Sequence, residues 1–437
     1  MDSSDVNKNK PFLDFIDIKE GDVVVVKPNL VKECKETDIS EWKSVITSSS
    51  VIFAVSDYVC QRLRNTGKLI ICDAPQTDSS FKLIAGKLDL YKIATDCAKK
   101  YGTVVEVVDL RNEEWTNKDG VIIDRKKLSG DPNGAIAFNL GKDSLFYGYK
   151  GEGKYYGADY DFKEVNSHHI KDRQEYLICG TPICADVFIS LPKLKTHKKT
   201  GVTLSIKNLV GINADKNWLP HHTWGSPKSG GDEYPDLSLK RRIETIGSKF
   251  LKRMAIWYPA LGTKLVHVAR KEGARVFGSG KDTIRSGNWY GNDTTWRMTL
   301  DLNRCLLYGN PDGSLRISGR KRYYSIIDGE IGMEGAGPMQ GDPKTCGVYI
   351  SGEDPASVDA VAATLMGFDW KRLPVIREAF REITMPISEV DPLSIQIVSD
   401  IEEWNGSLNN LRNQEHFDFI PHFGWKGHIE LPNHKSL

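Results

Sequence analysis

The sequence predicts an α/β fold made of two lobes with mainly parallel sheets and a cleft between the lobes. In the N-terminal half, apolar runs of strand length alternate with segments whose apolar residues recur at helical spacing. This alternation is typical of an α/β layer built on a parallel sheet. A second alternation of the same kind towards the C-terminus predicts the second lobe.

The first lobe begins with the valine run of residues 22–30, DVVVVKPNL. Because its four valines are consecutive, we expect a strand that is covered on both faces and that stops near its proline. Residues 49–64 predict a helix that begins after serine caps. The other elements expected in this lobe are a strand at 68–72, a helix at 88–100 and a strand at 103–110.

The second lobe is predicted from two strands and one helix. Residues 323–328 and 346–351 are apolar runs of strand length. Asp354 and Pro355 predict the start of a helix that Gly367 ends. We expect this helix to be buried, because it is apolar all round except at Asp359.

The pattern divides the chain into three parts. The N-terminal α/β lobe covers residues 1–215 and includes a polar excursion at 111–174, where we expect short edge strands that cover the site. Residues 216–300 contain an aromatic loop and a helical connecting segment that begins at residue 237. Residues 301–437 form the C-terminal α/β lobe and a tail that wraps the surface.

Composition excludes several classes of protein. The 437 residues are 40% hydrophobic with a mean hydropathy of −0.39, and 59 basic against 58 acidic residues give a net charge of +1. No overall charge attracts nucleic acid or a membrane surface, so we expect neither partner. The polar N-terminus predicts no signal peptide, and no apolar run reaches the roughly 20 residues of a membrane helix. The eight cysteines include no C-x-x-C pair and predict free thiols in the cytoplasm.

The most unusual stretch is residues 187–211, VFISLPKLKTHKKTGVTLSIKNLVG. It opens as a buried strand and then places five basic side chains within seven residues. Lysine is rarely fully buried without a partner, so we expect this cluster to face a cleft, and a solvated basic loop is the alternative. The basic residues are Lys193, Lys195, His197, Lys198 and Lys199.

The position of Lys207 favours the interpretation that the basic cluster faces a cleft. It lies within the apolar run of residues 204–210, where a half-buried ammonium needs an anionic partner or a lowered pKa. Such a lysine can hold a carboxylate or phosphate, or react as a free amine. We expect Lys207 to hold the anion or a cofactor, Asn208 to orient it, and Lys193 and Lys195 to attract it.

Three polar motifs follow predicted strands: KPN at 27–29, DAP at 73–75 and PKLKTH at 192–197. Ligands of open α/β sheets bind beyond the carboxyl ends of the strands, so these motifs should share one rim. We expect Lys27 and Asn29 to contact the substrate.

Three acidic residues are candidate ligands of a divalent metal or candidate partners of the histidine. Magnesium and manganese prefer oxygen ligands, which carboxylates supply. The candidates are Asp73, Glu334 and Asp359.

Two aromatic-rich segments add further candidates. Residues 213–236 are too irregular for a helix or strand and too aromatic for a linker, which predicts an ordered functional loop with His221 and His222 as catalytic candidates. Residues 286–297, SGNWYGNDTTWR, combine aromatic rings with amides and an arginine and suit a sugar, nucleotide or organic acid. A capped helix start explains the same residues, and both interpretations can hold together. The candidates for substrate binding there are Trp289, Asn292, Asp293 and Arg297.

The motifs KPN, DAP, LPKLKTHKKTGVTLSIKNLVG, WYGNDTTWR, IIDGEIGMEGAGP and EDPASVDAVAATLMG occur in this order between residues 22 and 370. In this arrangement the chain resembles the family known as domain of unknown function 362. Many members of that family look like redox or cofactor-related enzymes with an appended ferredoxin module, C-x-x-C-x-x-C-x-x-x-C, which this sequence lacks.

A more distant resemblance is to the nickel-pincer lactate racemase family. In that family a histidine acts as acid and base, and a lysine ten residues later tethers a pyridine-derived nickel cofactor. His197 and Lys207 have this spacing, and His221 or His222 lies where that family places a further histidine facing the metal. The resemblance makes the nickel-pincer nucleotide a testable cofactor.

These features predict an enzyme that acts on a small anionic substrate, such as a hydroxy acid, a sugar acid or a nucleotide-linked sugar. His197 would be the general acid/base, since an unperturbed histidine pKa of about 6.5 serves both directions near neutral pH. The reaction would be an isomerisation, an epimerisation or a redox step, assisted by a metal or cofactor. The alternatives are a non-catalytic cofactor or nucleotide carrier and an interaction protein that binds through residues 218–234. The oligomeric state stays open.

Overall fold

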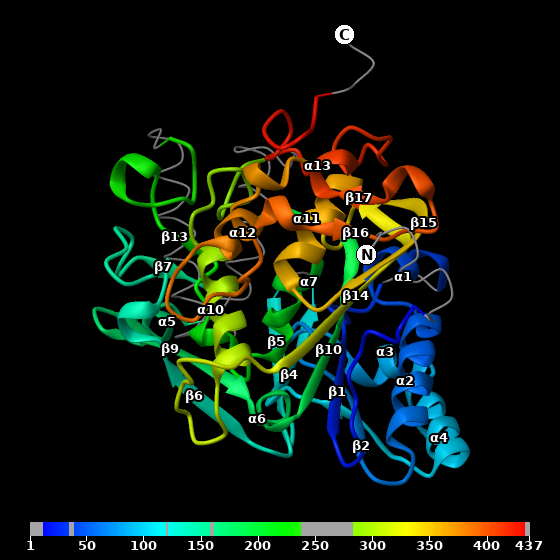
Figure 1. The fold of residues 1–437 in the computed structure, drawn as a ribbon. Coiled ribbons are helices and arrows are strands. Elements are labelled where there is room, and N and C mark those ends of the chain that lie inside the picture. Colours follow the sequence, from blue (N-terminus) through cyan, green and yellow to red (C-terminus); the bar gives the residue numbers. More distant parts are fainter. Residues whose placement is uncertain (1–11, 35–38, 119–120, 158–160, 237–282, 433–437) are drawn as a thin grey trace.

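The structure is a computed structural model, which describes residues 12–34, 39–118, 121–157, 161–236 and 283–432 (Figure 1). The predicted helical connecting segment falls within 237–282 and lies outside these residues. In the described part, all eight cysteines are free thiols, and no helix is long and apolar enough to cross a membrane.

The centre of the fold is one eight-stranded sheet with the order β12-β11-β14-β10-β1-β2-β3, in which β15 also pairs with β14. The pairs β11–β12 and β14–β15 are antiparallel and the others are parallel. The predicted α/β class with a mainly parallel sheet is therefore confirmed. The strands are β1 Val23–Pro28, β2 Lys68–Asp73, β3 Val104–Asp109, β10 Val187–Leu191, β11 Lys193–His197, β12 Gly201–Val202, β14 Arg322–Glu334 and β15 Asp342–Gly352.

The valine run of β1 has the double burial that the sequence predicts. Val24 and Val26 belong to the apolar cluster on one face of the sheet, whereas Val25 belongs to the cluster on the other face, and all three are fully buried. Side chains alternate between the faces of a strand, so only a run of consecutive apolar residues can fill both clusters.

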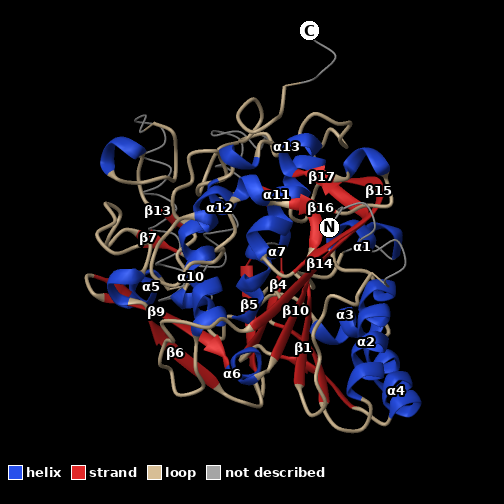
Figure 2. Cartoon of the chain, viewed as in Figure 1, coloured by secondary structure: helices blue, strands red, loops and turns tan. Residues whose placement is uncertain are grey.

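Helices cover both faces of the sheet (Figure 2). The face of Val24 packs against α1 to α4, and the face of Val25 packs against α7, α10 and α11. Apolar positions at helical spacing in α2, including Val51, Val55 and Val59, explain why that segment forms a helix with one buried side. The helices are α1 Ile39–Val45, α2 Ser49–Leu63, α3 Phe81–Lys87, α4 Leu90–Tyr101, α5 Phe162–His168, α6 Gly180–Cys184, α7 Leu204–Asn208, α10 Thr295–Tyr308, α11 Pro355–Leu365, α12 Pro374–Arg377 and α13 Leu408–Leu411.

The described residues do not show two separate lobes. Strand β14, which we assigned to the C-terminal lobe, lies between β10 and β11 of the N-terminal one. The glycine-rich sequence after residue 328 continues this strand instead of ending it. A Cβ on Gly332 would lie 2.9 Å from the backbone oxygen of Leu194, so glycine permits the close approach of β14 to β11.

The polar excursion forms small antiparallel sheets, as expected from its short strands. The β4–β5 hairpin stands alone, β9 pairs with β6 and β8, and β7 pairs with β13 of the aromatic loop. The strands of these sheets and of the C-terminal pair are β4 Glu113–Lys118, β5 Val121–Lys127, β6 Ala135–Asn139, β7 Tyr155–Tyr156, β8 His169–Ile170, β9 Arg173–Cys179, β13 His222–Thr223, β16 Gln396–Ile397 and β17 Gly406–Ser407. The short 3₁₀ helices are η2 Gly141–Asp143, η3 Leu209–Ile212, η4 Lys216–Trp218, η5 Pro227–Ser229, η6 Trp370–Arg372, η7 Glu378–Phe380, η8 Pro392–Ser394 and η9 Glu402–Trp404.

The C-terminal tail contributes to the core as well as to the surface. Trp425 and Ile429 are buried in the same apolar cluster as α10 and α11. The indole nitrogen of Trp425 donates to the backbone oxygen of Lys198 at 3.0 Å. The tail therefore fixes the loop that follows β11.

Candidate functional site

A cavity of about 1060 Å³ opens at the carboxyl ends of β1, β2 and β11. The structure brings the three predicted rim motifs together there, since Lys27, Asn29, Asp73, Lys195 and His197 all line it. The β4–β5 hairpin, the loop at residues 336–340 and the tail at residues 422–423 complete the walls.

Lys27 is held rigidly at the base of the cavity. Its Nζ lies 2.7 Å from Asp73 Oδ1 and donates to the backbone oxygen of Pro28 and to Asn208 Oδ1, both at 3.0 Å. A Cβ on Gly211 would lie 2.1 Å from the same Asp73 oxygen, so a glycine is required beside this pair. With three acceptors around it, Lys27 is held in one position at the lining of the cavity, and the substrate contact expected of it stays a prediction.

Through its hydrogen bonds to Lys27 and Asn29, the side-chain amide of Asn208 also fixes the orientation of the Asn29 amide. An ammonium only donates, so the Asn208 atom that faces Lys27 is the oxygen, and Asn208 Nδ2 donates to the backbone oxygen of Lys27 at 3.3 Å and to Ser190 Oγ at 2.9 Å. Asn29 Nδ2 in turn donates to Asn208 Oδ1 at 3.1 Å. Asn29 Oδ1 is therefore fixed as an acceptor, and it has no hydrogen-bond partner in the described part of the chain.

Replacing Asn208 should be costly because it leaves buried donors without acceptors. We expect Asn208→Leu, which nearly keeps the volume, to lower the free energy of unfolding by about 2–4 kcal/mol. Urea denaturation measures the change, and the exposed Asn409→Leu is the control, expected to stay within about 0.5 kcal/mol of the wild type. Equal losses in the two variants would show that the Asn208 network contributes no stability.

His197 is a neutral hydrogen-bond donor in this cavity. Its Nδ1 accepts the backbone N–H groups of Lys199 at 3.1 Å and Thr200 at 3.2 Å, so the ring proton sits on Nε2. Burial, followed by the charges of Lys207 and three nearby lysines, lowers the pKa of His197 well below its usual value. The unperturbed pKa that we expected from the sequence does not hold here, because the same basic cluster that attracts an anion disfavours the imidazolium ion.

Lys207 reaches the cavity from the short helix α7. Burial and then the charge of Lys216 lower the pKa of Lys207 to about 7, and its amine has no hydrogen-bond partner among the described residues. Asp359 fixes the helix, because its carboxylate accepts the backbone N–H groups of Ser205 at 2.7 Å and Ile206 at 3.0 Å. Asp359 thus positions Lys207 and lies beneath it, outside the cavity lining.

Two more lysines line the cavity without a carboxylate. Lys195 Nζ donates to the backbone oxygen of Val45 at 2.6 Å, and Lys216 Nζ donates to those of Ala74 and Val210 at 3.2 and 3.0 Å. Burial is the main cause that lowers the pKa of Lys195 to about 7 and that of Lys216 to about 8.

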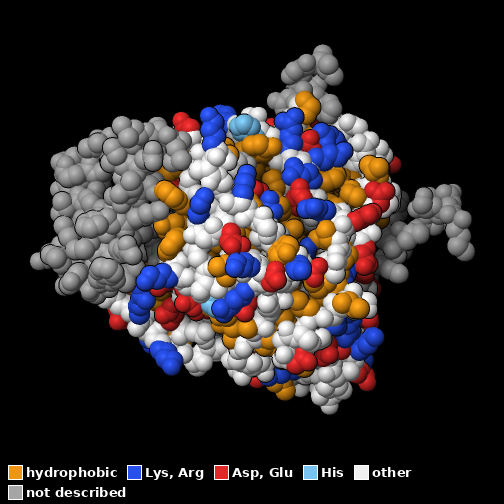
Figure 3. Space-filling model, turned by 90° about the vertical axis from the view of Figure 1, so that its left-hand side faces the viewer, with side chains coloured by type: hydrophobic (Ala, Val, Ile, Leu, Met, Phe, Trp, Pro, Cys, Tyr) orange, Lys and Arg blue, Asp and Glu red, His pale blue; other side chains and the backbone are white. Residues whose placement is uncertain are grey.

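The two carboxylates of the lining are already paired, Asp73 with Lys27 and Asp78 with Lys32. On the outer face in Figure 3, acidic and basic side chains are interspersed. The cavity is therefore a local cationic site in a protein of nearly zero net charge.

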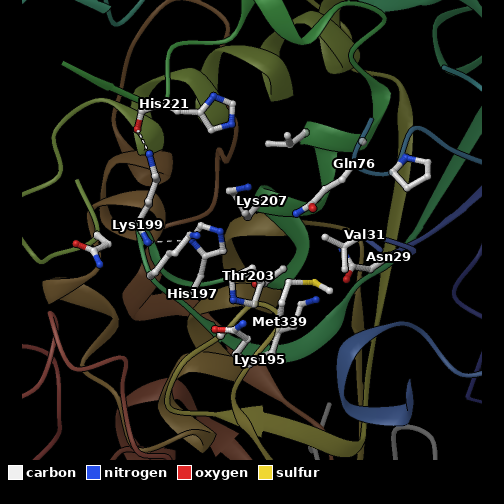
Figure 4. A pocket seen from close by; sticks show the side chains of 18 of the residues that line it. Asn29, Val31, Gln76, Lys195, His197, Lys199, Thr203, Lys207, His221 and Met339 are labelled. Carbon is white, nitrogen blue, oxygen red and sulfur yellow. Dashed lines mark hydrogen bonds between the residues drawn. The ribbon is translucent and has the colours of Figure 1, made fainter. Parts of the chain in front are cut away.

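His221 presents a hydrogen-bond acceptor to the cavity, whereas His197 presents a donor. Its Nδ1 donates to the backbone oxygen of Leu219 at 2.9 Å, which leaves the lone pair on Nε2, and burial lowers its pKa to about 3. Figure 4 shows Lys207, His197 and His221 extending into one space. His222, next along β13, points to the other side and stacks on Tyr156 with the ring centres 5.4 Å apart. Of the two predicted histidines, only His221 lines the cavity.

With this geometry described, the chain can be compared with known proteins. The model of the family described as Domain of unknown function (DUF362) matches residues 103–364, more than half of the chain. The chain belongs to this family. The resemblance seen in the sequence motifs is thereby confirmed.

One curated relative of this DUF362 chain is a thylakoid-associated protein of Synechocystis sp., which is 24% identical over 212 residues. The aligned part covers 47% of this chain and 42% of that protein, so the match spans less than half of the relative. No solved structure shows a significant match to this chain.

The aromatic segment of this DUF362 chain builds a helix start, as the alternative interpretation proposed, with Thr294 as the N-cap residue of α10. Asn292 Oδ1 accepts the backbone N–H groups of Thr294 at 3.2 Å and Thr295 at 2.8 Å. Trp289 donates to the backbone oxygen of Asp232 at 2.8 Å, and Arg297 pairs with Asp293 at 3.0 Å. None of these four residues is among those that line the cavity.

The predicted metal ligands also have other partners. Glu334 pairs with Lys344 at 2.9 Å, while Asp73 and Asp359 are engaged by Lys27 and by α7. In the described part of the DUF362 chain, no three His, Cys, Asp or Glu residues lie close enough to hold a metal ion. Lys193, expected to attract the substrate, is instead buried in an ion pair with Asp328 at 2.9 Å.

Several lining residues were missed from the sequence. They come from turns and from the excursion, where no periodic pattern marks a position. The signal for Lys216 was its place in the loop directly after the Lys207 helix. The missed residues include Gln76, Trp115, Lys216, Arg285, Met339 and His422.

Proposed function

We propose that this chain is an enzyme that transfers a proton to and from carbon in a small organic anion, as an isomerase or epimerase does. The observation that carries the proposal is the shared cavity of Lys207, His197 and His221. A lysine whose pKa is about 7 exists partly as the free amine at neutral pH, and a base is most effective when its pKa lies near the working pH.

The expected roles follow from the hydrogen bonds of each group. Lys207 removes a proton from the carbon next to a carbonyl group, and the electron pair moves to the carbonyl oxygen. His197 Nε2–H donates to that oxygen, where negative charge develops. Returning the proton to either face of the carbon completes the reaction. The roles of acid/base and anion holder are thus exchanged relative to our expectation from the sequence.

A metal or the nickel-pincer nucleotide would find two nitrogen donors in this cavity, Lys207 Nζ and His221 Nε2. A metal held there would act as a Lewis acid. The carboxylates of the described lining are paired with lysines, so this part of the lining offers a metal no unpaired carboxylate. The protein residues alone supply the proton transfer described above.

Hydrogen exchange with solvent tests the proposal. The wild type is incubated in D₂O with a panel of 2-keto acids, hydroxy acids and sugar acids, and deuterium at carbon is followed by NMR. We expect exchange with at least one of them, a loss of about 10²–10⁴-fold in Lys207→Met, and a loss of about 10²–10³-fold in His197→Phe.

The control is Lys87→Met, an exposed lysine of α3, which should match the wild type. A Lys207→Met variant with wild-type activity would remove the lysine from the mechanism.

A non-catalytic carrier is the second candidate, and the size of the cavity favours it. About 1060 Å³ exceeds what a small hydroxy acid needs and lies at the upper end of the volumes of small-molecule sites, which reach about 1,000 Å³. A carrier predicts a retained ligand and no turnover. Ultraviolet spectra, metal analysis and mass spectrometry of freshly purified protein, including the mass of the peptide with Lys207, separate the two candidates. The free thiols agree with a reducing compartment, and we propose the cytoplasm.

A further inference from the structure

Strand β11 contains two buried lysines with different surroundings. Lys193 and Lys195 are two residues apart and equally buried, with 1% and 0% of their surface exposed. Lys193 has a counter-ion in Asp328, whereas Lys195 donates to the backbone oxygen of Val45 and has no carboxylate partner among the described residues. Within the described part of the chain, the fold therefore supplies a carboxylate to one buried lysine of this strand and not to the one that lines the cavity.

Lys216 lies at another wall of the cavity and, like Lys195, donates to backbone oxygens. It follows η3 and donates to backbone oxygens beside the end of β2, whereas Lys195 donates to the last residue of α1. Lys207 lines the same cavity as these two lysines. The charge of Lys207 acts on Lys195 and the charge of Lys216 acts on Lys207, but Lys216 is not among the main influences on Lys195.

We infer that the ligand of the cavity carries two separate anionic groups, one held by Lys195 and the other by Lys216, with its reacting carbon beside Lys207. This inference rests on the proposed function and names the class of its substrate. The ammonium groups of Lys195 and Lys216 each have N–H groups that do not donate to their backbone acceptors. A buried ammonium group is strongly stabilised by an anion at hydrogen-bond distance.

The part of the ligand between the anionic groups is expected to carry hydroxyl groups. Asn29 Oδ1 is held as an acceptor by the Lys27–Asn208 network, and His221 Nε2 presents a lone pair. Acceptors select hydroxyl groups over further anions, and a cationic cavity disfavours a protonated amine. A phosphorylated sugar acid, with a carboxylate at one end and a phosphate at the other, has this chemistry.

Calorimetric titration at pH 7.5 and low salt provides the test, with three probes: 6-phosphogluconate, gluconate and inorganic phosphate. We expect 6-phosphogluconate to bind at least about 10-fold tighter than either single anion, which corresponds to about 1.4 kcal/mol. Lys195→Met and Lys216→Met should each weaken 6-phosphogluconate binding by about 10-fold or more, and each should weaken only one of the two single anions.

Two results would overturn the inference. One is equal affinity of the wild type for all three probes, and the other is equal weakening of both single anions by both variants. Lys87→Met is the control for loss of a surface charge, and thermal unfolding checks that each variant is folded. The wild-type comparison of the three probes decides the question even if a variant does not fold.

Failure of the inference and failure of the proposed function can be told apart. If 6-phosphogluconate binds with the expected pattern and its carbon-bound hydrogens do not exchange with D₂O, the proton-transfer reaction is wrong and the dianion site remains. If exchange occurs only with singly charged acids, the reaction remains and the dianion site is wrong.

Discussion

Lys193→Met and Lys195→Met are expected to change stability in opposite directions, although the two lysines are two residues apart on β11. Lys193→Met leaves the carboxylate of Asp328 buried without its cation, and such broken pairs cost about 3–5 kcal/mol. Lys195→Met removes an ammonium that has no carboxylate partner and whose pKa burial lowers to about 7. We expect Lys195→Met to raise the free energy of unfolding by about 1 kcal/mol at pH 7, because an apolar side chain is less costly to bury.

Denaturation in urea at pH 7 and low salt measures both changes with the same substitution, so side-chain volume is matched. The Lys193→Met,Asp328→Asn double variant is the control, and it should recover part of the loss because it removes the uncompensated carboxylate. A large loss of stability in Lys195→Met would show that this lysine has a counter-ion in the folded chain. The cationic lining would then have one member fewer.

The local elements of the fold could be predicted because they depend on short-range patterns. The valine run of β1, the apolar spacing of α2 and the proline and glycine at the ends of α11 each determine an element within a few residues. The division into lobes could not be predicted in this way. Whether β14 pairs with β10 or begins a new sheet depends on pairing across more than one hundred residues of chain, which leaves no local periodicity.

The residues of the site could be predicted where they follow the end of a strand. They could not be predicted where their role depends on which polar side chain they pair with. The rule that ligands bind at the carboxyl ends of parallel strands correctly led to Asn29, Lys195 and His197. The sequence could not show that Lys193 would pair with Asp328, or that Trp289 would donate to the backbone oxygen of Asp232. Such pairs form between residues that are distant in sequence, so only the folded chain reveals which polar groups remain for a ligand.

Burial, followed by the crowding of positive charge, lowers the pKa values of the histidines of the site and keeps them neutral. Each added lysine stabilises a bound anion and at the same time disfavours protonation of His197 and of the other lysines. The amines of such a site are partly neutral in the free protein, and a bound anion restores the protons of the two lysines that hold it, Lys195 and Lys216. Binding of the ligand and uptake of protons should therefore be coupled.

The affinity for 6-phosphogluconate is accordingly expected to fall between pH 7.5 and 9, by about 10-fold per pH unit for each proton taken up. In the free protein the pKa values of Lys195, Lys207 and Lys216 are lowered to about 7, 7 and 8, so these amines lose their protons through this range. An anion held by Lys195 and Lys216 raises the pKa values of these two lysines, which makes binding strongest below the free values and weaker as pH rises. The phosphate of the probe is fully ionised throughout, since its second pKa is about 6.

Titrations in two buffers with different ionisation enthalpies measure the number of protons taken up, and we expect about one to two per ligand at pH 8. The other charged or titratable groups that face the three amines are Lys27, Asp73, Asp78, Lys198, Lys199, His197, His221, Arg285 and His422. His197 and His221 stay neutral over this range, because their pKa values are lowered below it.

The stability of the free protein should rise with pH, whereas the affinity for 6-phosphogluconate should fall. The unfolded chain binds more protons at these lysines than the folded chain between pH 7 and about 10, so the free energy of unfolding should rise with pH over pH 7.5–9. Lys195→Met should lower the number of protons taken up per ligand by about one. It should also reduce the rise of the free energy of unfolding with pH by the contribution of one lysine. Flat affinity and flat stability across this range would mean that the three amines are already neutralised in the free protein, which contradicts a cationic site waiting for its anion.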